Sequence, residues 1–227
     1  MYRPYKPHVA TRLVGLLMMA LLAAPASAVN GKASFYGGNL AGGNCLLTSY
    51  TLPAGIFGTA IAGPNYESSG MCGVCLNVKG PKGSMKVMVV DSCPGCPTNQ
   101  LDLFQNGFPN IGDRNAGVVP VSWDVTPCGI KEPLKVRNKD GTSRFWFAMQ
   151  VFNSDKKVTA LDVSTDGGRT WQPTARRDYN FFEKPGGGGG FGADAVTVRV
   201  TCAGGGTVTM QNVGMTSGAT FTAAGNC

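Results

Sequence analysis

The sequence predicts a mostly β protein in which a small barrel is followed by a sandwich of two sheets. Three observations support this fold class. Short apolar runs that are β-branched or alternate with polar residues recur along the chain, bounded by Gly, Pro, Asn or Asp. Helical periodicity is scarce after the N-terminal segment. Six of the eight cysteines precede residue 130 and two follow it, which indicates two parts of different construction.

The N-terminal segment Met1–Ala28 has the features of a secretory signal peptide. It combines a basic start, an apolar run from Leu13 to Ala24 and the small residues Ala26–Ala28, which form an A-x-A cleavage site. The apolar run is too short to span a bilayer. We therefore expect a secreted, extracellular protein without a membrane partner, with a mature chain that starts at Val29.

The length and charge of the mature chain limit its organisation and its partners. Its 199 residues allow one large domain or two of about 100 residues each. A Pro- and Gly-bearing seam at Thr126–Pro133 divides them, so we expect domains over 29–130 and 131–227. Seventeen basic residues against 13 acids leave a net charge of +4. This charge suits an anionic polymer or wall surface and is too weak to indicate nucleic acid. We expect a monomer.

The individual elements follow from local patterns. Strands are predicted at Cys75–Val78, Met85–Val90, Val118–Val125, Arg144–Val151, Val158–Val163 and Val196–Val200. Hairpin turns are predicted at Lys139–Gly141 and Thr165–Gly168. Leu103–Phe108 is the one plausible helix of the first half. The Gly186–Gly190 run predicts a flexible loop between strands.

The cysteines favour disulfides over a metal site. An even count after a signal peptide is typical of a disulfide framework. The alternative is a four-cysteine zinc site, because Cys72-x-x-Cys75 and Cys93-x-x-Cys96 are separated by 17 residues. Secretion makes oxidation the default, so we expect no metal. Eight cysteines allow 105 pairings, and spacing alone does not choose among them.

Asp91 and Asp102 are the candidate functional acids of the first half. Asp91 follows the apolar run Val87–Val90, and Asp102 stands eleven residues further on between two leucines. Strand ends feed loops where polar sites gather, and partial burial between leucines favours the protonated form that a general acid requires. The structural alternatives are that Asp102 caps a short helix and that Asp91 binds backbone amides of the Pro94–Gly95 turn. Composition alone favours these structural interpretations.

Other functional groups in the first half are few. Between Val29 and Asp91 the only acid is Glu67, so the chain is short of the second carboxylate that glycoside hydrolysis uses. Ser34 and Tyr36 near the mature start offer hydroxyls and an aromatic face, which makes Tyr36 a candidate substrate contact. The sole histidine lies in the predicted signal peptide, which excludes His-based triads and His–metal sites from the mature chain.

The second half carries aromatic residues in polar surroundings. In Arg144–Val151 the odd positions are apolar, so a strand period of two buries them and turns the even positions to solvent. This pattern exposes Trp146, and an exposed indole is suited to stacking on a sugar ring. Alternation buries Phe145, although a bulge at the strand start would expose it. Tyr179 is a further aromatic in polar company.

Taken together, these residues resemble the microbial expansins, which are also similar to plant expansins and family-45 glycoside hydrolases. Gly31–Tyr36 matches the opening strand of the family, and Val90-Asp91 with Leu101–Leu103 reproduces its two acidic motifs and their spacing. Lys139–Trp146 and Asp178–Asn180 match the carbohydrate-binding second domain. The resemblance covers essentially the whole mature chain.

The resemblance implies a six-stranded double-psi β-barrel packed on an immunoglobulin-like β-sandwich. By position, Ser34 occupies the place of a hydroxyl-bearing residue, which is usually threonine in the family. Asp91 occupies the place of the first aspartate, and Asp102 that of the essential acid. The three aromatic binding positions are Phe145, Trp146 and Tyr179. The implied disulfides are Cys45–Cys72, Cys75–Cys128, Cys93–Cys96 and Cys202–Cys227. Two departures stand out: Cys93 replaces a frequent tyrosine, and Phe145 replaces a tryptophan.

Three function classes follow. The first, which we favour, is a non-enzymatic protein that binds cellulose and plant-type wall polysaccharides and loosens their non-covalent contacts without a cofactor. The second is a glycosidase, either an inverting endoglucanase or a peptidoglycan lytic transglycosylase, with Asp91 substituting for the missing base. The third is a module that only binds polysaccharide. Release of soluble sugar distinguishes the second class from the others, and creep of wall material distinguishes the first from the third.

Overall fold

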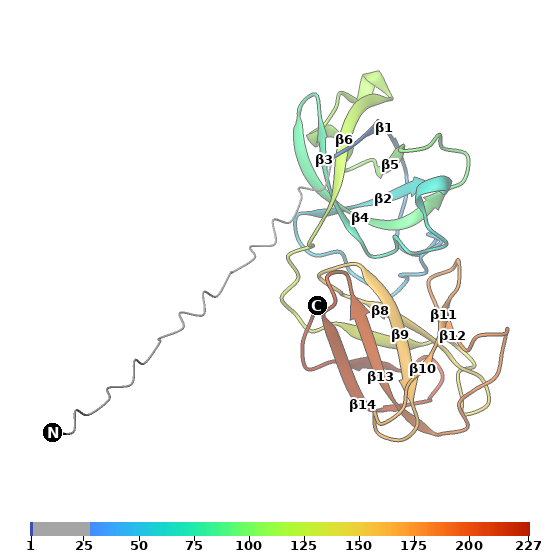
Figure 1. The fold of residues 1–227 in the computed structure, drawn as a ribbon. Helices are drawn as coiled ribbons and strands as arrows, with labels where there is room; N and C mark the ends of the chain where they lie inside the picture. Colours follow the sequence, from blue (N-terminus) through green and yellow to red (C-terminus); the bar gives the residue numbers. More distant parts are fainter. Residues whose placement is uncertain (2–27) are drawn as a thin grey trace.

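The computed structural model describes Met1 and residues 28–227, and these residues are almost entirely β (Figure 1). The predicted signal peptide falls on residues 2–27, which lie outside the described residues. Three short 3-10 helices, and no α-helix, occur in the described part: η1 (Gly63–Asn65), η2 (Phe108–Asn110) and η3 (Arg114–Ala116). No helix of this part has the length and apolar character needed to cross a membrane.

The first six strands close into a barrel, shown in the upper part of Figure 1. They are β1 (Val29–Tyr36), β2 (Ile56–Ala62), β3 (Cys75–Gly80), β4 (Gly83–Cys93), β5 (Leu101–Phe104) and β6 (Val119–Thr126). Their order around the barrel is β1-β5-β2-β4-β3-β6, with parallel pairing of β1 with β5 and of β2 with β4. Closure leaves no unpaired sheet edge in the barrel.

The remaining strands form two antiparallel sheets. One sheet has the order β10 (Gln172–Pro173), β9 (Val158–Ser164), β13 (Ala195–Cys202) and β14 (Thr207–Gly214). The other has the order β11 (Ala175–Arg176), β12 (Phe182–Glu183), β8 (Ala148–Phe152), β7 (Lys135–Asn138) and β15 (Thr220–Thr222). Val136, Met149 and Leu161 are among the side chains that both sheets bury in one core, which makes this half a sandwich. The predicted fold class is confirmed.

Two of the predicted elements are wrong. Leu103–Phe108 is not a helix, because Leu103 and Phe104 complete strand β5 and only Phe108 enters a 3-10 turn. Leu101 and Leu103 are fully buried in the barrel core, so a strand period, not a helix period, places them there. The predicted strand Arg144–Val151 begins only at Ala148, because Ser143 and Trp146 pair across a tight turn. The other five predicted strands are found.

All eight cysteines form disulfides, which confirms the prediction. The pairs are Cys45–Cys72, Cys75–Cys128, Cys93–Cys96 and Cys202–Cys227, as the family resemblance implied. The four cysteines of the zinc-like pattern are therefore used in three separate bridges. Cys75–Cys128 joins the start of β3 to the segment after β6, and Cys202–Cys227 fastens the C-terminal residue to the end of β13.

We expect the stabilisation from each bridge to follow the length of the loop it closes. Replacing both Cys75 and Cys128 by Ala opens a separation of 53 residues and should lower the free energy of unfolding by about 4 kcal/mol. The matched change at Cys93 and Cys96, with a separation of 3 residues, should cost less than about 2 kcal/mol. Urea unfolding of the two double variants measures the difference. Equal losses would contradict the loop-entropy explanation.

Candidate functional site

A single cross-strand row brings the sequence-predicted barrel residues together. Ser34 on β1 is the register partner of Asp102 on β5, and Asp102 is opposite Ala60 on β2. Ala60 is also the partner of Asp91 on β4. Residues separated by 55 to 68 positions in the chain thus become neighbours on one face of four adjacent strands.

A β-bulge places Asp91 in this row. The register of β2 with β4 pairs Thr59 with Val89 and then Ala60 with Asp91, so Val90 is the extra residue. The sequence predicted that Asp91 lies at a strand end, but β4 continues to Cys93 and Asp91 lies within it. A bulge turns the following side chain to the other face of the sheet. The partly exposed Asp91 therefore follows Val89 and Val90, which are both buried in the core.

Asp102 lies on the outer face of β5. Its neighbours Leu101 and Leu103 are fully buried, so alternation directs the partly exposed Asp102 away from the core. Ser34 Oγ donates a hydrogen bond to Asp102 Oδ1 at 2.6 Å, and Gln100 Nε2 donates to Ser34 Oγ at 2.9 Å. Because Asp102 is in a strand, the alternative that it caps a helix is wrong.

Asp91 is held by three hydrogen bonds. Its Oδ1 accepts from the backbone amides of Asn44, at 2.7 Å, and Ser92, at 2.8 Å, and its Oδ2 accepts from the Tyr36 hydroxyl at 3.2 Å. The expectation that Asp91 binds amides of the Pro94–Gly95 turn is wrong, since the amides come from elsewhere. Asp91 thus fixes a barrel loop through Asn44, whereas within the described residues the carboxylate of Asp102 accepts only from Ser34.

Tyr36 belongs to the same face of the barrel. It lies two residues after Ser34 on β1, and its ring meets Phe104 edge to face at 5.6 Å. Burial and the nearby charge of Asp91 raise the pKa of Tyr36, so its hydroxyl keeps its proton and remains a hydrogen-bond donor. The four candidate barrel residues therefore form one polar surface of Ser34, Tyr36, Asp91 and Asp102.

The aromatic residues of the sandwich lie beside a tight turn. Ser143 and Trp146 exchange backbone hydrogen bonds of 2.8 and 3.2 Å, which places Phe145 near the tip of the turn with 77% of its surface exposed. Phe145 is therefore exposed, but by a turn and not by the bulge that we considered. Trp146 is partly exposed, and Lys139 Nζ lies 5.9 Å from the centre of its ring.

The prediction that the even-numbered residues of this segment face solvent is wrong for the two that follow Trp146. Ala148 and Gln150 are fully buried, although alternation predicted that they are exposed together with Trp146. For Gln150 the reason is contact with the barrel, because Gln150 Nε2 donates to the carbonyl of Cys45 at 2.8 Å. The exposed aromatic surface therefore ends where the barrel begins.

Tyr179 lies in the loop between β11 and β12. Its hydroxyl donates to the buried Glu183, which also forms an ion pair of 2.8 Å with Arg177. Burial, followed by the contact with Glu183, raises the pKa of Tyr179 to about 12. Lys139 Nζ lies 6.0 Å from the Tyr179 ring centre and so is placed between Tyr179 and Trp146.

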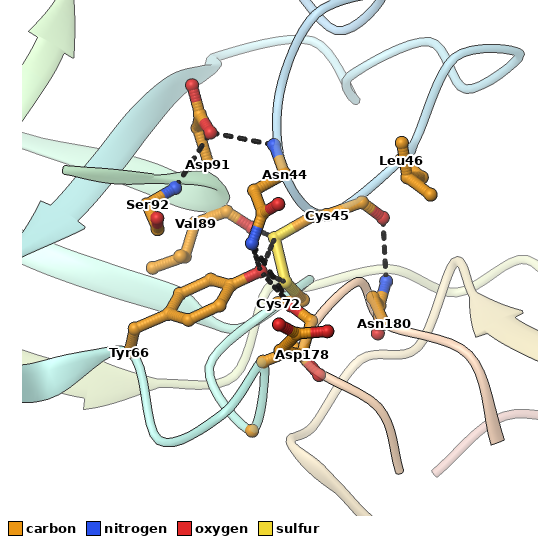
Figure 2. The surroundings of a disulfide bond; sticks show 12 residues. Asn44, Cys45, Leu46, Tyr66, Cys72, Val89, Asp91, Ser92, Asp178 and Asn180 are labelled. Atoms are coloured by element: carbon orange, nitrogen blue, oxygen red, sulfur yellow. Dashed lines mark hydrogen bonds between the residues drawn. A yellow bond between two sulfur atoms is a disulfide. The ribbon is translucent and has the colours of Figure 1, made fainter. Parts of the chain in front are cut away.

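An open polar hollow lies between the barrel and the sandwich, next to Asp91. It has a volume of about 530 Å³ and is lined by Gly42, Asn44, Tyr66, Asp91, Ser92, Pro94 and Asp178. Figure 2 shows how Asp91 from the barrel and Asp178 from the sandwich lie on either side of Asn44. The sequence did not identify Asn44 or Tyr66, and it placed Lys139 only in a hairpin turn and in the segment that matches the family. No local pattern marks Asn44 or Tyr66, because the bonds that Asn44 makes with Tyr66 and Asp178 join residues 22 and 134 positions apart.

The geometry defines a class of protein: a closed β-barrel with an acid-bearing polar face, docked on a β-sandwich with exposed aromatic rings. Comparison with known proteins gives the family. The chain is 33% identical to Expansin-YoaJ of Bacillus subtilis over 175 residues, which cover 75% of this chain and 72% of that protein. It is 30% identical to Expansin-like protein 1 of Dictyostelium discoideum, covering 70% of this chain and 59% of that protein. The chain belongs to the expansin family.

Solved structures agree with this assignment. A mutant of the Clavibacter michiganensis expansin, crystallised with cellohexaose, superposes with a TM-score of 0.78 at 31% identity, covering 88% of this chain and 98% of that one. The apo structure of the same expansin gives a TM-score of 0.77 at 32% identity. No family model matches the chain. Over the described residues, no group of three or more His, Cys, Asp or Glu side chains is arranged to hold a metal ion.

The glycine run braces the aromatic turn. Phe147 N donates to the carbonyl of Gly189 at 3.2 Å, and Gly192 N donates to the carbonyl of Arg144 at 2.9 Å. A Cβ at Gly190 would overlap the backbone of Arg144, so this close approach requires glycine. The run predicted as a flexible loop between strands is thus a loop that packs against the Phe145 turn.

We expect Gly190→Ala to lower the free energy of unfolding by about 1–3 kcal/mol, because the loop or the turn must move to make room. Gly206→Ala is the matched control, since nothing lies within 4 Å of a Cβ there and its backbone is not left-handed. That control should change stability by less than about 0.5 kcal/mol. Chemical denaturation of both variants measures the effect. Equal stability of the two variants would contradict the close packing of the glycine loop.

Proposed function

We propose that this protein is a secreted, polysaccharide-binding expansin that loosens non-covalent contacts between wall polymers without hydrolysing them. Family membership supports polysaccharide binding, and the Clavibacter michiganensis relative crystallised with cellohexaose indicates a β-glucan such as cellulose. Four disulfides fit an oxidising, extracellular location. The protein acts as a monomer and uses neither nucleic acid nor membrane as a partner.

The observation that carries this proposal is the unequal bonding of the two acids. Inverting hydrolysis needs an acid and also a carboxylate base that activates water. The group opposite Asp102 is the Ser34 hydroxyl, which is no base. Asp91 is the only other acid of the row, and its oxygens already accept three hydrogen bonds. A carboxylate whose lone pairs are used in this way is suited to fixing structure.

Asp102 is suited to competing for glycan hydrogen bonds. In the described residues only its Oδ1 has a protein partner, so Oδ2 is available to a ligand. When protonated, the Asp102 carboxyl donates one hydrogen bond to a hydroxyl or glycosidic oxygen of the bound chain, and when ionised it accepts one from a hydroxyl. Each such bond replaces a contact between glucan chains of about 1 kcal/mol. Without a base to direct water, the bound chain is shifted and no bond breaks.

The sandwich supplies the affinity through its aromatic rings. Phe145, Trp146 and Tyr179 expose ring surface on which sugar rings stack. Lys139 lies within 6.0 Å of the rings of Trp146 and Tyr179 and adds a donor for sugar hydroxyls. Ser34 and Tyr36 extend the polar surface of the barrel as further sugar contacts. The rings bind the polymer, and the barrel face alters its contacts.

A second candidate function is an inverting glycosidase with Asp91 as base. One observation favours it: Asp91 and Asp102 are both partners of Ala60, so two strand spacings separate their Cα atoms by about 9–10 Å. Inverting enzymes place their carboxyl groups about 6.5–9.5 Å apart, and two side chains on one face with this Cα separation are compatible with that range. The two functions differ in whether the protein releases soluble sugar.

Asp102→Asn should abolish the extension of wall strips under load, while binding to cellulose stays within about twofold. The amide keeps the shape of the side chain, but it has neither the negative charge nor the acidic O–H group of the Asp102 carboxyl. Asp124→Asn is the matched control, because Asp124 is a partly exposed acid on β6 outside the row. It should leave wall extension unchanged. A creep assay beside a pull-down on cellulose measures both properties.

The same preparations distinguish the alternative. We expect no steady release of reducing sugar from cellulose, peptidoglycan or wall material by the wild-type protein. Wall loosening that survives Asp102→Asn contradicts the proposed role of Asp102. Steady release of oligosaccharides that Asp91→Asn abolishes would instead establish Asp91 as a base and this chain as a glycosidase.

Trp146→Ala should reduce cellulose binding at least tenfold, because stacking on a partly exposed ring is lost. The free energy of unfolding should fall by less than about 1 kcal/mol, since exposed positions tolerate substitution. Trp171→Ala is the matched control, because Trp171 lies next to β10 of the other sheet and packs under Arg199. It should leave binding unchanged. If Trp146→Ala unfolds the protein, the ring is a core residue.

A further inference from the structure

The loop that carries Tyr179 is fastened to the barrel on both sides of that residue. Before it, the Asp178 carbonyl accepts hydrogen bonds from the Tyr66 hydroxyl at 2.9 Å and from Asn44 Nδ2 at 3.1 Å. After it, Asn180 Nδ2 donates to the carbonyl of Cys45 at 3.0 Å. Because the residues on both sides of Tyr179 are hydrogen-bonded to the barrel, Tyr179 has little freedom to move relative to the barrel.

The loop itself is a closed turn. Arg177 N donates to the Phe181 carbonyl at 2.7 Å, and Asn180 N donates to the Arg177 carbonyl at 3.0 Å. Asn180 has a φ of 66°, a left-handed conformation that Asn tolerates well. Ser69 Oγ adds a further bond from the barrel, 2.6 Å from the Arg177 carbonyl. The turn is therefore a rigid unit whose position is set by the barrel loops.

Asn44 connects this turn to the barrel acids. Its backbone amide donates to Asp91, and its side-chain amide donates to the Tyr66 hydroxyl at 2.9 Å as well as to Asp178. The Tyr66 hydroxyl thus accepts from Asn44 and donates to Asp178, as the dashed lines of Figure 2 show. Burial is the main reason that the pKa of Tyr66 is raised to about 12, so this hydroxyl retains the proton it donates.

We propose that Tyr66 and Asn44 are positioning residues that hold the sugar-stacking ring of Tyr179 in register with the acid-bearing row of the barrel. This inference rests on the proposed function, in which one glucan chain contacts both halves. The register is decided by directional hydrogen bonds to the Asp178 carbonyl. A glucan long enough to cross the hollow between Asp91 and Asp178 then meets both contact sets at a fixed spacing, without a cost for ordering the two halves.

The chain offers a matched pair of tyrosines for testing this. The Tyr50 hydroxyl also crosses from barrel to sandwich, donating to Asn153 Oδ1 at 3.1 Å, and burial raises the pKa of Tyr50 to about 12 as well. Substitution by Phe therefore removes from each tyrosine a hydroxyl that donates across the interface, and at Tyr66 it also removes the bond accepted from Asn44. Only Tyr66 is bonded to the turn of Tyr179. A purely structural role predicts equal effects of Tyr66→Phe and Tyr50→Phe on ligand affinity.

The experiment measures cellohexaose binding by calorimetry, and insoluble cellulose binding by depletion, with the full chain. We expect Tyr66→Phe to weaken binding about three- to tenfold and Tyr50→Phe to leave it within about twofold, while both lower the Tm by similar amounts. In a Tyr179→Ala background, Tyr66→Phe should no longer change the affinity, because its effect passes through the Tyr179 ring. Tyr50→Phe should remain without effect in that background.

Equal effects of the two Phe variants, or an undiminished effect of Tyr66→Phe in the Tyr179→Ala background, would overturn this inference and leave the proposed function intact. Failure of the wild-type protein to bind either cellohexaose or cellulose would overturn the proposed function, and this inference with it. Asn44→Ala provides a second variant, since it removes the side-chain bonds but keeps the backbone amide that Asp91 accepts from. It should weaken binding as Tyr66→Phe does, and unchanged binding would count against the proposal.

Discussion

The docking of the sandwich on two disulfide-linked loops of the barrel is the constraint on which the rest of the structure depends. The Cys45–Cys72 bridge joins the loop before β2 to the loop before β3. The carbonyl of Cys45 accepts hydrogen bonds from both Gln150 and Asn180. One peptide group of the barrel is therefore bonded both to strand β8 and to the turn of Tyr179 in the sandwich. Without this contact, the seam between the halves would not define their relative orientation.

The polar character of that interface explains its precision. Hydrogen bonds are directional, so donors such as Gln150 and Tyr66 fit their carbonyl acceptors in one register only. Leaving such groups buried and unpaired costs about 1–3 kcal/mol each, which penalises any displacement. The ion pair of Lys157 with Glu67 also crosses the interface, at 2.6 Å, but it is partly exposed and adds less. The outcome is a defined orientation of the sandwich relative to the barrel.

The same reasoning separates the roles of the two acids. Asp91 and Asp102 occupy equivalent places in one cross-strand row, and their chemistry differs because of what bonds to them. Two backbone amides and a tyrosine hydroxyl make Asp91 part of the scaffold, whereas a single serine leaves Asp102 with an unused oxygen. A bulge at Val90 is what allows Asp91 to reach the row at all. A one-residue change in strand register thus decides that Asp91 and Asp102 lie in the same cross-strand row.

The sequence by itself determined the class of fold, the use of all cysteines in disulfides, and the candidate residues Ser34, Asp91, Asp102, Trp146 and Tyr179, because alternation, turn residues and motif spacing are local properties. It assigned Leu103–Phe108 to a helix and the face of Gln150 to solvent, and both were wrong. Burial in a closed barrel and coverage by a second domain are set by partners far along the chain. Only the tertiary structure decided that Ser34 lies opposite Asp102, that a tight turn exposes Phe145, and that Asn44 and Tyr66 fix the turn of Tyr179, since each depends on contacts between segments that no sequence window contains.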